Sequence, residues 1–254
     1  MRSIVIGDVH GCIVEFRQLV EKLRLTPQDN LVLVGDLMDK GPDPVACVRY
    51  ARELGARMVM GNHEERHLRW RAHEDRRAAN PNGKKNPMKP LGEKQAAENA
   101  ALSVEDIAWL RSLPLTLQFG NWVVVHGGLM PGLSLEDQTN DRLRLRQVDT
   151  KTGKMFPVDL DKPNDSPPGV RWWMELWDGK ENVVYGHAAH GLQEPRVDRN
   201  ALGAECWGID TGCAYGGRLT ALVLETREVV QVPAEQAYAR WFGGPTTETA
   251  AHPG

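Results

Sequence analysis

The residues of this 254-residue chain that are best suited to chemistry begin with Asp8 and His10, in the stretch Ile6-Gly-Asp-Val-His-Gly11. In an extended Asp-x-His segment both side chains project to the same side of the backbone. A carboxylate oxygen and an imidazole nitrogen can therefore hold one metal ion between them. Because two ligands do not complete a metal site, the sequence predicts that other segments bring further ligands to this stretch.

Five short apolar runs, each typical of a buried strand, are followed by Asp, Asn or His beside a glycine. Packing alone does not require this pattern. Any one of these polar residues would more often be structural, but together they indicate a metal centre. The runs are Ser3–Ile6, Leu31–Val34, Met58–Met60, Trp122–Val125 and Val183–Tyr185, and the polar residues are Asp8 and His10, Asp36, Asn62 and His63, His126, and His187.

Helices are expected between the first three strands, where they would place the polar residues at one edge of a sheet. Apolar residues recur at helical spacing over 14–25, and Asp43-Pro44 provides an N-cap and a first-turn proline for a helix to about residue 54. A third helix is expected after Gly61-Asn-His-Glu64, to about residue 71. Three consecutive β-α units predict a parallel sheet with its functional groups at the carboxyl ends of the strands.

The second half of the chain contains further strands and one short helix. Ser103-x-x-Asp106 predicts a capping box for a helix that ends near residue 113. Residues 115–125 predict a hairpin that turns at Gly120-Asn121. Later apolar runs predict further strands at 207–209, 219–224 and 229–232.

We expect one domain over residues 1–242, since the length and composition fit a single globular unit. The segment 149–169 is rich in Asp, Lys and Pro and predicts a long surface loop. Residues 243–254 predict a disordered tail. Without an apolar run near ~18 residues or a signal-like start, we expect a cytoplasmic protein with no membrane partner.

Charge and cysteine content narrow the class of protein. The net charge of −3 gives no global attraction to nucleic acid. Between Arg66 and Lys94, however, the chain contains nine Lys or Arg residues but only three Asp or Glu residues. Such a run is usually a solvated surface. Because this one starts beside Asn62-His63, we give comparable weight to a second interpretation, in which residues 66–100 form a basic cap or insert that covers an anionic substrate. The four cysteines form no C-x-x-C pair, which argues against a zinc knuckle or a disulfide framework.

Taken together, the motifs resemble those of the dinuclear-metal phosphoesterases with a calcineurin-like fold, in the phosphoprotein phosphatase superfamily. The nearest resemblance is to the ApaH-like phosphatases, relatives of the symmetrical diadenosine tetraphosphatases. It implies an α/β fold in which a two-sheet β-sandwich is flanked by helices, as four layers α/β/β/α. The motifs are Gly7-Asp-Val-His-Gly11, Gly35-Asp-Leu-Met-Asp-Lys-Gly41, Gly61-Asn-His-Glu64, His126-Gly-Gly128, Gly186-His187 and Ile209-Asp-Thr-Gly-Cys-Ala-Tyr-Gly-Gly217.

The resemblance implies two divalent metal ions that share Asp36. The first would be held by Asp8, His10 and Asp36, and the second by Asp36, Asn62, His126 and His187. Mixed His, Asp and Asn ligands suit Mn, Fe or Zn, and manganese is our expectation. Two such ions ~3.5–4 Å apart lower the pKa of a bridging water and clamp phosphate oxygens. The bridging hydroxide would attack phosphorus directly, without a covalent enzyme intermediate.

Other residues are assigned by the same resemblance. His63 would be the general acid for the leaving oxygen, oriented by Asp39. Lys40 stands where related protein phosphatases carry arginine, and its point charge tolerates more varied phosphate geometries than a planar guanidinium. Arg146 is the nearest match for a second phosphate-binding arginine. Asn62 would also contact the substrate phosphate.

Several substrates fit these motifs. Phosphate anhydrides or phosphomonoesters come first, with dinucleoside polyphosphates as the first natural candidates, so that the partner is a phosphorylated small molecule or nucleotide. A protein Ser/Thr phosphatase acting on a phosphoprotein is the alternative. RNA 5′-end or polyphosphate hydrolysis is also open, with Trp172 and Trp173 either stacking on bases or packing in the core. The presence of every expected ligand and of His63 counts against a non-catalytic phosphate-binding pseudo-enzyme.

Overall fold

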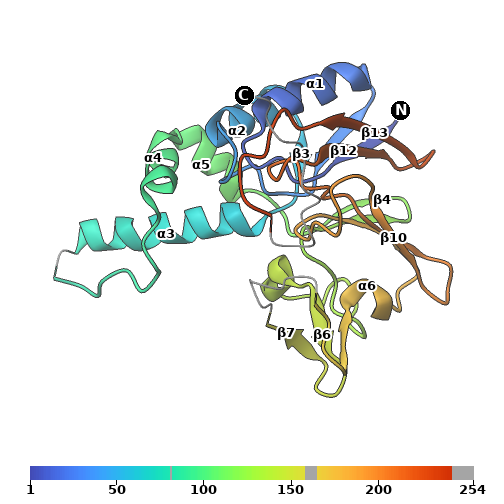
Figure 1. Ribbon diagram of the computed structural model, residues 1–254. Helices are drawn as coiled ribbons and strands as arrows, with labels where there is room; N and C mark the ends of the chain where they lie inside the picture. Colours follow the sequence, from blue (N-terminus) through green and yellow to red (C-terminus); the bar gives the residue numbers. More distant parts are fainter. Residues whose placement is uncertain (81, 158–164, 242–254) are drawn as a thin grey trace, which may run out of the picture.

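The first sheet places the N-terminal strand at its centre. The computed structural model describes residues 1–80, 82–157 and 165–241 (Figure 1). The sheet has the order β13-β12-β1-β2-β3. Strands β1, β2 and β3 are parallel, as predicted, whereas β12 and β13 are antiparallel to their neighbours. The bounds are β1 Ser3–Ile6, β2 Asn30–Leu33, β3 Arg57–Met58, β12 Arg218–Val223 and β13 Glu228–Pro233.

The second sheet has the order β10-β11-β9-β5-β4. Its central strand β9 is parallel to both β5 and β11, so the ends of β5 and β9 carry His126 and His187 to the same edge. The predicted hairpin is confirmed as the antiparallel pair β4 and β5. The bounds are β4 Leu117–Phe119, β5 Trp122–Val124, β9 Asn182–Tyr185, β10 Arg196–Arg199 and β11 Glu205–Gly208.

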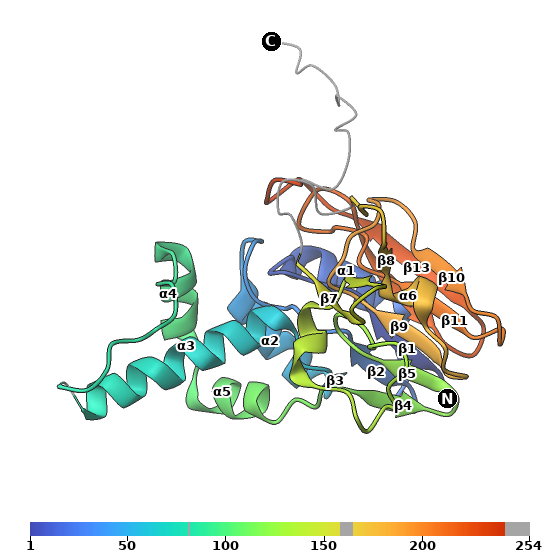
Figure 2. The ribbon, with the colours of Figure 1, turned by 90° about the horizontal axis from the view of Figure 1, so that it is seen from below.

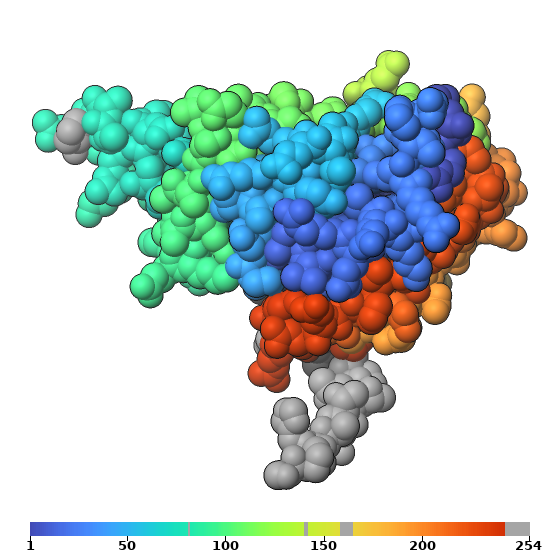
Figure 3. All heavy atoms as spheres, turned by 90° about the horizontal axis from the view of Figure 1, so that it is seen from above, coloured from blue at the N-terminus to red at the C-terminus, as the bar shows by residue number. Residues whose placement is uncertain are grey.

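Alternating side chains on β1 connect two layers of core. Ile4 and Ile6 pack in the core beneath helices α1 and α2, whereas Val5 packs with Val124 and Val184 between the two sheets. The predicted two-sheet sandwich is therefore confirmed, and Figure 3 shows α1 and α2 (blue) covering one face. The helices are α1 Ile13–Leu23, α2 Pro44–Glu53 and α5 Val104–Arg111.

The outer face of the second sheet is covered by a small unit that the sequence did not predict. It consists of the one-turn helix α6, Trp173–Leu176, and a three-stranded sheet of order β7-β6-β8. Trp172 and Trp173 are 6% and 0% exposed, so both pack in the core. The strands are β6 Gln147–Asp149, β7 Lys154–Phe156 and β8 Val170–Trp172, and the 3-10 helix η1, Asn140–Arg144, precedes them.

These strands correct the expected loop over 149–169. Residues 154–156 form β7, so the loop prediction is wrong there, because a three-residue strand gives too little alternation to be recognised. Residues 158–164 of that segment, and the expected tail at 243–254, lie outside the described residues. No helix in the described ranges is long and apolar enough to cross a membrane.

Helix α3, Asn62–Ala79, begins earlier and ends later than the predicted helix, and it projects from the sheets as an arm (Figures 1 and 2). The segment 82–92 returns beside it and leads into α4, Glu93–Ala101, which was not predicted. Helix caps were easier to foresee. Asp43 accepts a hydrogen bond from the Ala46 N–H at 2.9 Å, and Ser103 and Asp106 form the predicted capping box.

One buried carboxylate joins α3 to the first sheet. Glu64 lies in the first turn of α3 and is completely buried. It accepts hydrogen bonds from the N–H groups of Asp36, Leu37 and Met38 at 2.9, 2.8 and 2.9 Å. The loop that follows β2 is therefore held against the start of α3, and three backbone donors that would otherwise be buried without a partner are satisfied.

Glu64→Gln is expected to lower the free energy of unfolding by about 1–3 kcal/mol, because the amide has one acceptor oxygen and leaves a buried N–H unsatisfied. Urea denaturation measures the change. Glu65→Gln is the matched control. Glu65 is partly exposed and pairs with Arg69 and Arg144, so its loss is expected to cost less than about 1 kcal/mol. Equal losses in both variants would contradict a special role for Glu64.

Candidate metal centre

The loops that carry the candidate residues have an unusual backbone. Outside glycine, a positive φ is rare because the Cβ atom is crowded there. Seven such residues occur in the described part of the chain, and five of them are predicted site residues. A concentration of strained backbone of this kind is typical of functional sites. The five are His10 (47°), Asp36 (53°), Asp39 (68°), Lys40 (66°) and His187 (66°).

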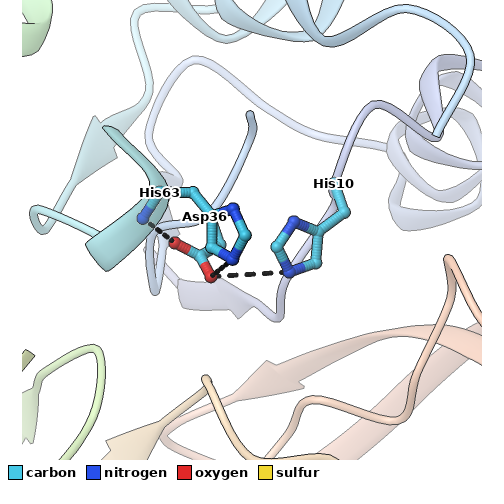
Figure 4. A group of neighbouring side chains, drawn as sticks. All are labelled: His10, Asp36 and His63. Carbon is cyan, nitrogen blue, oxygen red and sulfur yellow. Dashed lines mark hydrogen bonds and ion pairs between the residues drawn. The ribbon is translucent and has the colours of Figure 1, made fainter. Parts of the chain in front are cut away.

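The carboxylate of Asp36 lies among three imidazole rings. Its Oδ2 atom is 3.3 Å from His126 Nε2, 3.4 Å from His10 Nε2 and 3.8 Å from His63 Nε2. Its Oδ1 atom accepts a hydrogen bond from the His63 N–H at 3.1 Å. Figure 4 shows the carboxylate between His10 and His63. Asp36 itself is 1% exposed, so this is a desolvated carboxylate surrounded by nitrogen atoms.

Two of the rings are oriented by backbone carbonyl groups. Nδ1 of His10 is 2.8 Å from the Met38 carbonyl oxygen, and Nδ1 of His126 is 2.8 Å from that of Val34. A carbonyl only accepts, so each Nδ1 carries a proton, and each Nε2 faces Asp36 as the nitrogen that could bind a metal ion. This arrangement is common for histidines that bind metals.

Four of the six predicted ligands fall in two overlapping groups that share Asp36, and the first group also contains His63. Ligand atoms of Asp36, His10 and His63 lie within 4.8 Å of one another, and so do those of Asp36, His126 and His187. The two remaining ligands border these groups. Asn62 Oδ1 is 2.9 Å from His126 Nε2, and the Asp8 carboxylate lies 3.7 Å from His10 Nε2 and accepts the His187 N–H. A buried set of carboxylate, amide and imidazole donors fits divalent transition-metal ions.

Charges within the cluster shift its pKa values in opposite directions. Burial would raise the pKa of Asp36, but the imidazoles of His126, His63 and His10 outweigh burial and hold it well below its usual range. Burial and the nearby Asp210 raise the pKa of Asp8. Burial lowers the pKa of His126, but the charge of Asp36 outweighs it and raises this pKa to about 9.

Asp39 lies between two histidines of α3. One oxygen forms a hydrogen bond with His63 Nδ1, and the other is 2.9 Å from His67 Nε2. Asn99 donates to Nδ1 of His67 at 3.1 Å, so His67 carries its proton on Nε2 and donates it to Asp39. Burial would raise the pKa of Asp39, but the two imidazole hydrogen bonds hold it below its usual range.

Two residues of this neighbourhood, Glu64 and His67, were missed as site residues in the sequence. Both are completely buried in the first two turns of α3. For His67 a signal was present, because it stands four residues after His63 and such residues share one face of a helix. Glu64 is part of the Gly61-Asn-His-Glu64 motif, but the motif does not indicate its role. Its partners are backbone N–H groups, which no sequence pattern identifies.

The two predicted phosphate-binding cations are also at the centre. Lys40 Nζ is 2.6 Å from His10 Nε2 and 4.9 Å from the centre of the Tyr215 ring. Arg146 donates to the His187 carbonyl oxygen at 2.8 Å. Arg144, by contrast, pairs with Glu65 at 2.7 Å. Burial would lower the pKa of Lys40, but Tyr215, Asp36 and Asp210 outweigh it and raise this pKa, so Lys40 is a cation.

The chain is similar to curated proteins along most of its length. It is 30% identical to the symmetrical bis(5′-nucleosyl)-tetraphosphatase of Edwardsiella ictaluri, over 93% of this chain and 98% of that protein. It is 31% identical to the protein of the same name from Nitrosospira multiformis, over 91% and 95% of the two chains.

Solved structures and a family model agree with this similarity. A crystal structure described as "a putative diadenosine tetraphosphatase" has a TM-score of 0.72 and 29% identity, over 95% of each chain. A metallophosphoesterase from Sphaerobacter thermophilus shares the fold, with a TM-score of 0.53 and 16% identity over 93% of this chain and 89% of that one. The model of the calcineurin-like phosphoesterases matches residues 1–225. The chain therefore belongs to the calcineurin-like phosphoesterase family.

Proposed function

We propose that the protein is a phosphohydrolase with two divalent metal ions that cleaves dinucleoside polyphosphates. The observation that carries the proposal is the position of Asp36, whose buried carboxylate belongs to both groups of converging ligand atoms. A carboxylate has two oxygens and can serve two ions, whereas each imidazole serves one. Asp36 is thus the residue through which the two ions would be coupled.

The proposed ligands form two sets that share Asp36. Asp8 and His10 would hold one ion with it, and Asn62, His126 and His187 would hold the other. We infer manganese, because mixed oxygen and imidazole donors suit it. When bound, such a pair of ions supplies a nucleophile at neutral pH and charge stabilisation for the transferring phosphoryl group.

His63 has the geometry of a general acid. Its Nδ1 is bonded to Asp39, so its Nε2 is available for a proton that can pass to the leaving oxygen. The side chain of His63 is 21% exposed, compared with 3% for His10 and 0% for His126. A substrate can therefore reach His63 while the other two rings stay enclosed. The ionised Asp39 stabilises the protonated ring and fixes its orientation.

Lys40 and Arg146 would bind the phosphate from two directions. Lys40 approaches from the loop after β2, and Arg146 approaches beside His187. Both cations lie close to the ligand cluster, so they can contact phosphate oxygens together with Asn62. Charge-assisted hydrogen bonds of this kind are the strong ones in proteins.

Dinucleoside polyphosphates are supported as the substrate by the names of the similar bacterial proteins and by the lysine at position 40. The test is a panel of substrates with Mn²⁺, comparing diadenosine tetraphosphate, mononucleotides, polyphosphate and a phosphopeptide. The highest kcat/KM is expected for diadenosine tetraphosphate. A preference for the phosphopeptide would identify a protein phosphatase instead.

Asp36→Asn is expected to abolish the Mn²⁺-stimulated hydrolysis of a generic aryl phosphate, because an amide has only one oxygen able to bind an ion and carries no charge. Steady-state kinetics with metal analysis of the purified variant measures the loss. Asp75→Asn, an exposed position on α3, is the matched control and should behave as wild type. Unchanged turnover in Asp36→Asn would rule out the two-metal mechanism.

For His63→Asn we expect kcat to fall by about 10²–10⁴-fold with both metals retained, because the lost group donates a proton rather than a ligand atom. The decrease should be larger for a substrate whose leaving oxygen is strongly basic. Measurements of kcat for two aryl phosphates with different leaving groups, together with the metal content, decide the point. Loss of metal would instead make His63 a ligand.

A further inference from the structure

A row of basic side chains runs along α3 away from the candidate metal centre. Starting at Asn62, the residues Arg66, Arg69 and His73 follow at steps of four, three and four. Residues at these steps lie on one side of a helix. At 1.5 Å per residue the row is about 16 Å long. It therefore begins at a proposed metal ligand and ends far out on the arm.

This row forms one wall of a pocket of ≈ 670 Å³. The other walls come from two segments that are distant in the sequence, the end of η1 and the turn at 87–89. Both walls contribute a cation, so that basic groups face one another across the pocket. The lining residues are Arg66, Arg69, His73, Pro87, Met88, Lys89 and Arg144.

Specific contacts hold the turn against α3. The Asn86 side chain donates to the Trp70 carbonyl oxygen at 3.3 Å and to Glu74 at 2.9 Å. The two views of Figures 1 and 2 agree that the segment 82–92 runs back beside the helix. Lys89 is therefore placed at the pocket by folded structure. Lys84, near the tip of the arm, does not line the pocket.

The cations of the pocket are not balanced by acids. Glu65 is shared between Arg69 at 3.1 Å and Arg144 at 2.7 Å. In the described part of the chain, Arg66 and Lys89 form no ion pair, and no acid lines the pocket. Three arginines and one lysine thus face a single carboxylate. Like charges held this close repel one another, and an anion in the pocket would relieve that repulsion.

We propose that this pocket binds the phosphates of a nucleoside oligophosphate that lie beyond the reacting phosphate. The inference rests on the proposed function and adds a second, non-catalytic anion site to it. The row from Asn62 to His73 is long enough for a chain of several phosphates, one of which lies at the metal centre. Lys40 and Arg146 would bind the reacting phosphate, while Arg66, Lys89 and Arg144 bind those that follow.

The test measures inhibition of aryl phosphate hydrolysis by the Mn²⁺-loaded protein, with inorganic tripolyphosphate and orthophosphate as inhibitors. Lys89→Gln is expected to raise the Ki of tripolyphosphate by roughly threefold to tenfold, since it removes one charged contact made by an exposed side chain. The Ki of orthophosphate, which needs only the metal centre, should rise by a clearly smaller factor.

Lys84→Gln is the matched control, because Lys84 is an exposed lysine of the same segment 82–92 and lies outside the pocket. It should alter neither Ki. If the two substitutions change the Ki of tripolyphosphate equally, the inhibitor responds to the overall positive charge of the arm. That result would overturn the proposal that the pocket binds it. Arg66→Gln provides a second variant, with the same expected direction as Lys89→Gln.

Failure of the proposed function can be distinguished from failure of the pocket, and a small-molecule ligand can be distinguished from RNA. If the wild-type protein hydrolyses neither an aryl phosphate nor diadenosine tetraphosphate, the proposed function fails. The pocket is then tested by calorimetric titration of tripolyphosphate into the wild type, Lys89→Gln and Lys84→Gln, where equal affinities would overturn it. If a 5′-triphosphorylated oligoribonucleotide inhibits more strongly than a nucleoside triphosphate, and more so as it lengthens, the ligand is RNA and the assignment to a small molecule is overturned.

Discussion

The candidate centre depends on the hydrogen bonds that one buried carboxylate accepts from the loop after β2. Glu64 binds three consecutive N–H groups of that loop, at Asp36, Leu37 and Met38. Asp36 has a positive φ, and such strain, which costs about 1–3 kcal/mol, persists only where surrounding contacts hold the backbone in place. Glu64 supplies those contacts from α3, the helix that begins at Asn62 and His63. The same hydrogen bonds therefore fix the bridging carboxylate relative to two further residues of the site.

Asp39 makes a second connection between the same loop and the same helix, in the opposite direction. Here the loop provides the carboxylate and α3 provides the donors, His63 and His67. The loop and the helix are thus connected by two buried carboxylates, Glu64 from the helix and Asp39 from the loop. A proton donor can be placed accurately only if its own partner is immobile. Asn99, on α4, contributes to this by fixing the tautomer of His67.

The sequence predicted those parts of the molecule that rest on local patterns. Apolar runs marked the strands, and the parallel order of β1, β2 and β3 explains why Asp8, Asp36 and Asn62 meet at one edge. The three-residue strands β6, β7 and β8 gave no readable alternation. The roles of Glu64 and His67 depend on partners 26 to 28 residues away, most of them backbone groups, so they became visible only in three dimensions. The strained φ angles have only a weak sequence signal, the enrichment of Asp and His among the non-glycine residues that adopt a positive φ.

The position of the centre at the seam between the sheets makes it sensitive to the apolar core. Asp36 belongs to the first sheet and His126 to the second, and His126 donates across the seam to the Val34 carbonyl oxygen. The distance of 3.3 Å between Asp36 and His126 is therefore set by how closely the sheets approach. That approach is determined by side chains such as Val5 and Val184, which fill the space between the sheets at native packing density. These valines bind no metal ion, yet they fix the spacing of the two sheets that carry the ligands. The geometry of a metal centre built across two sheets therefore depends on them.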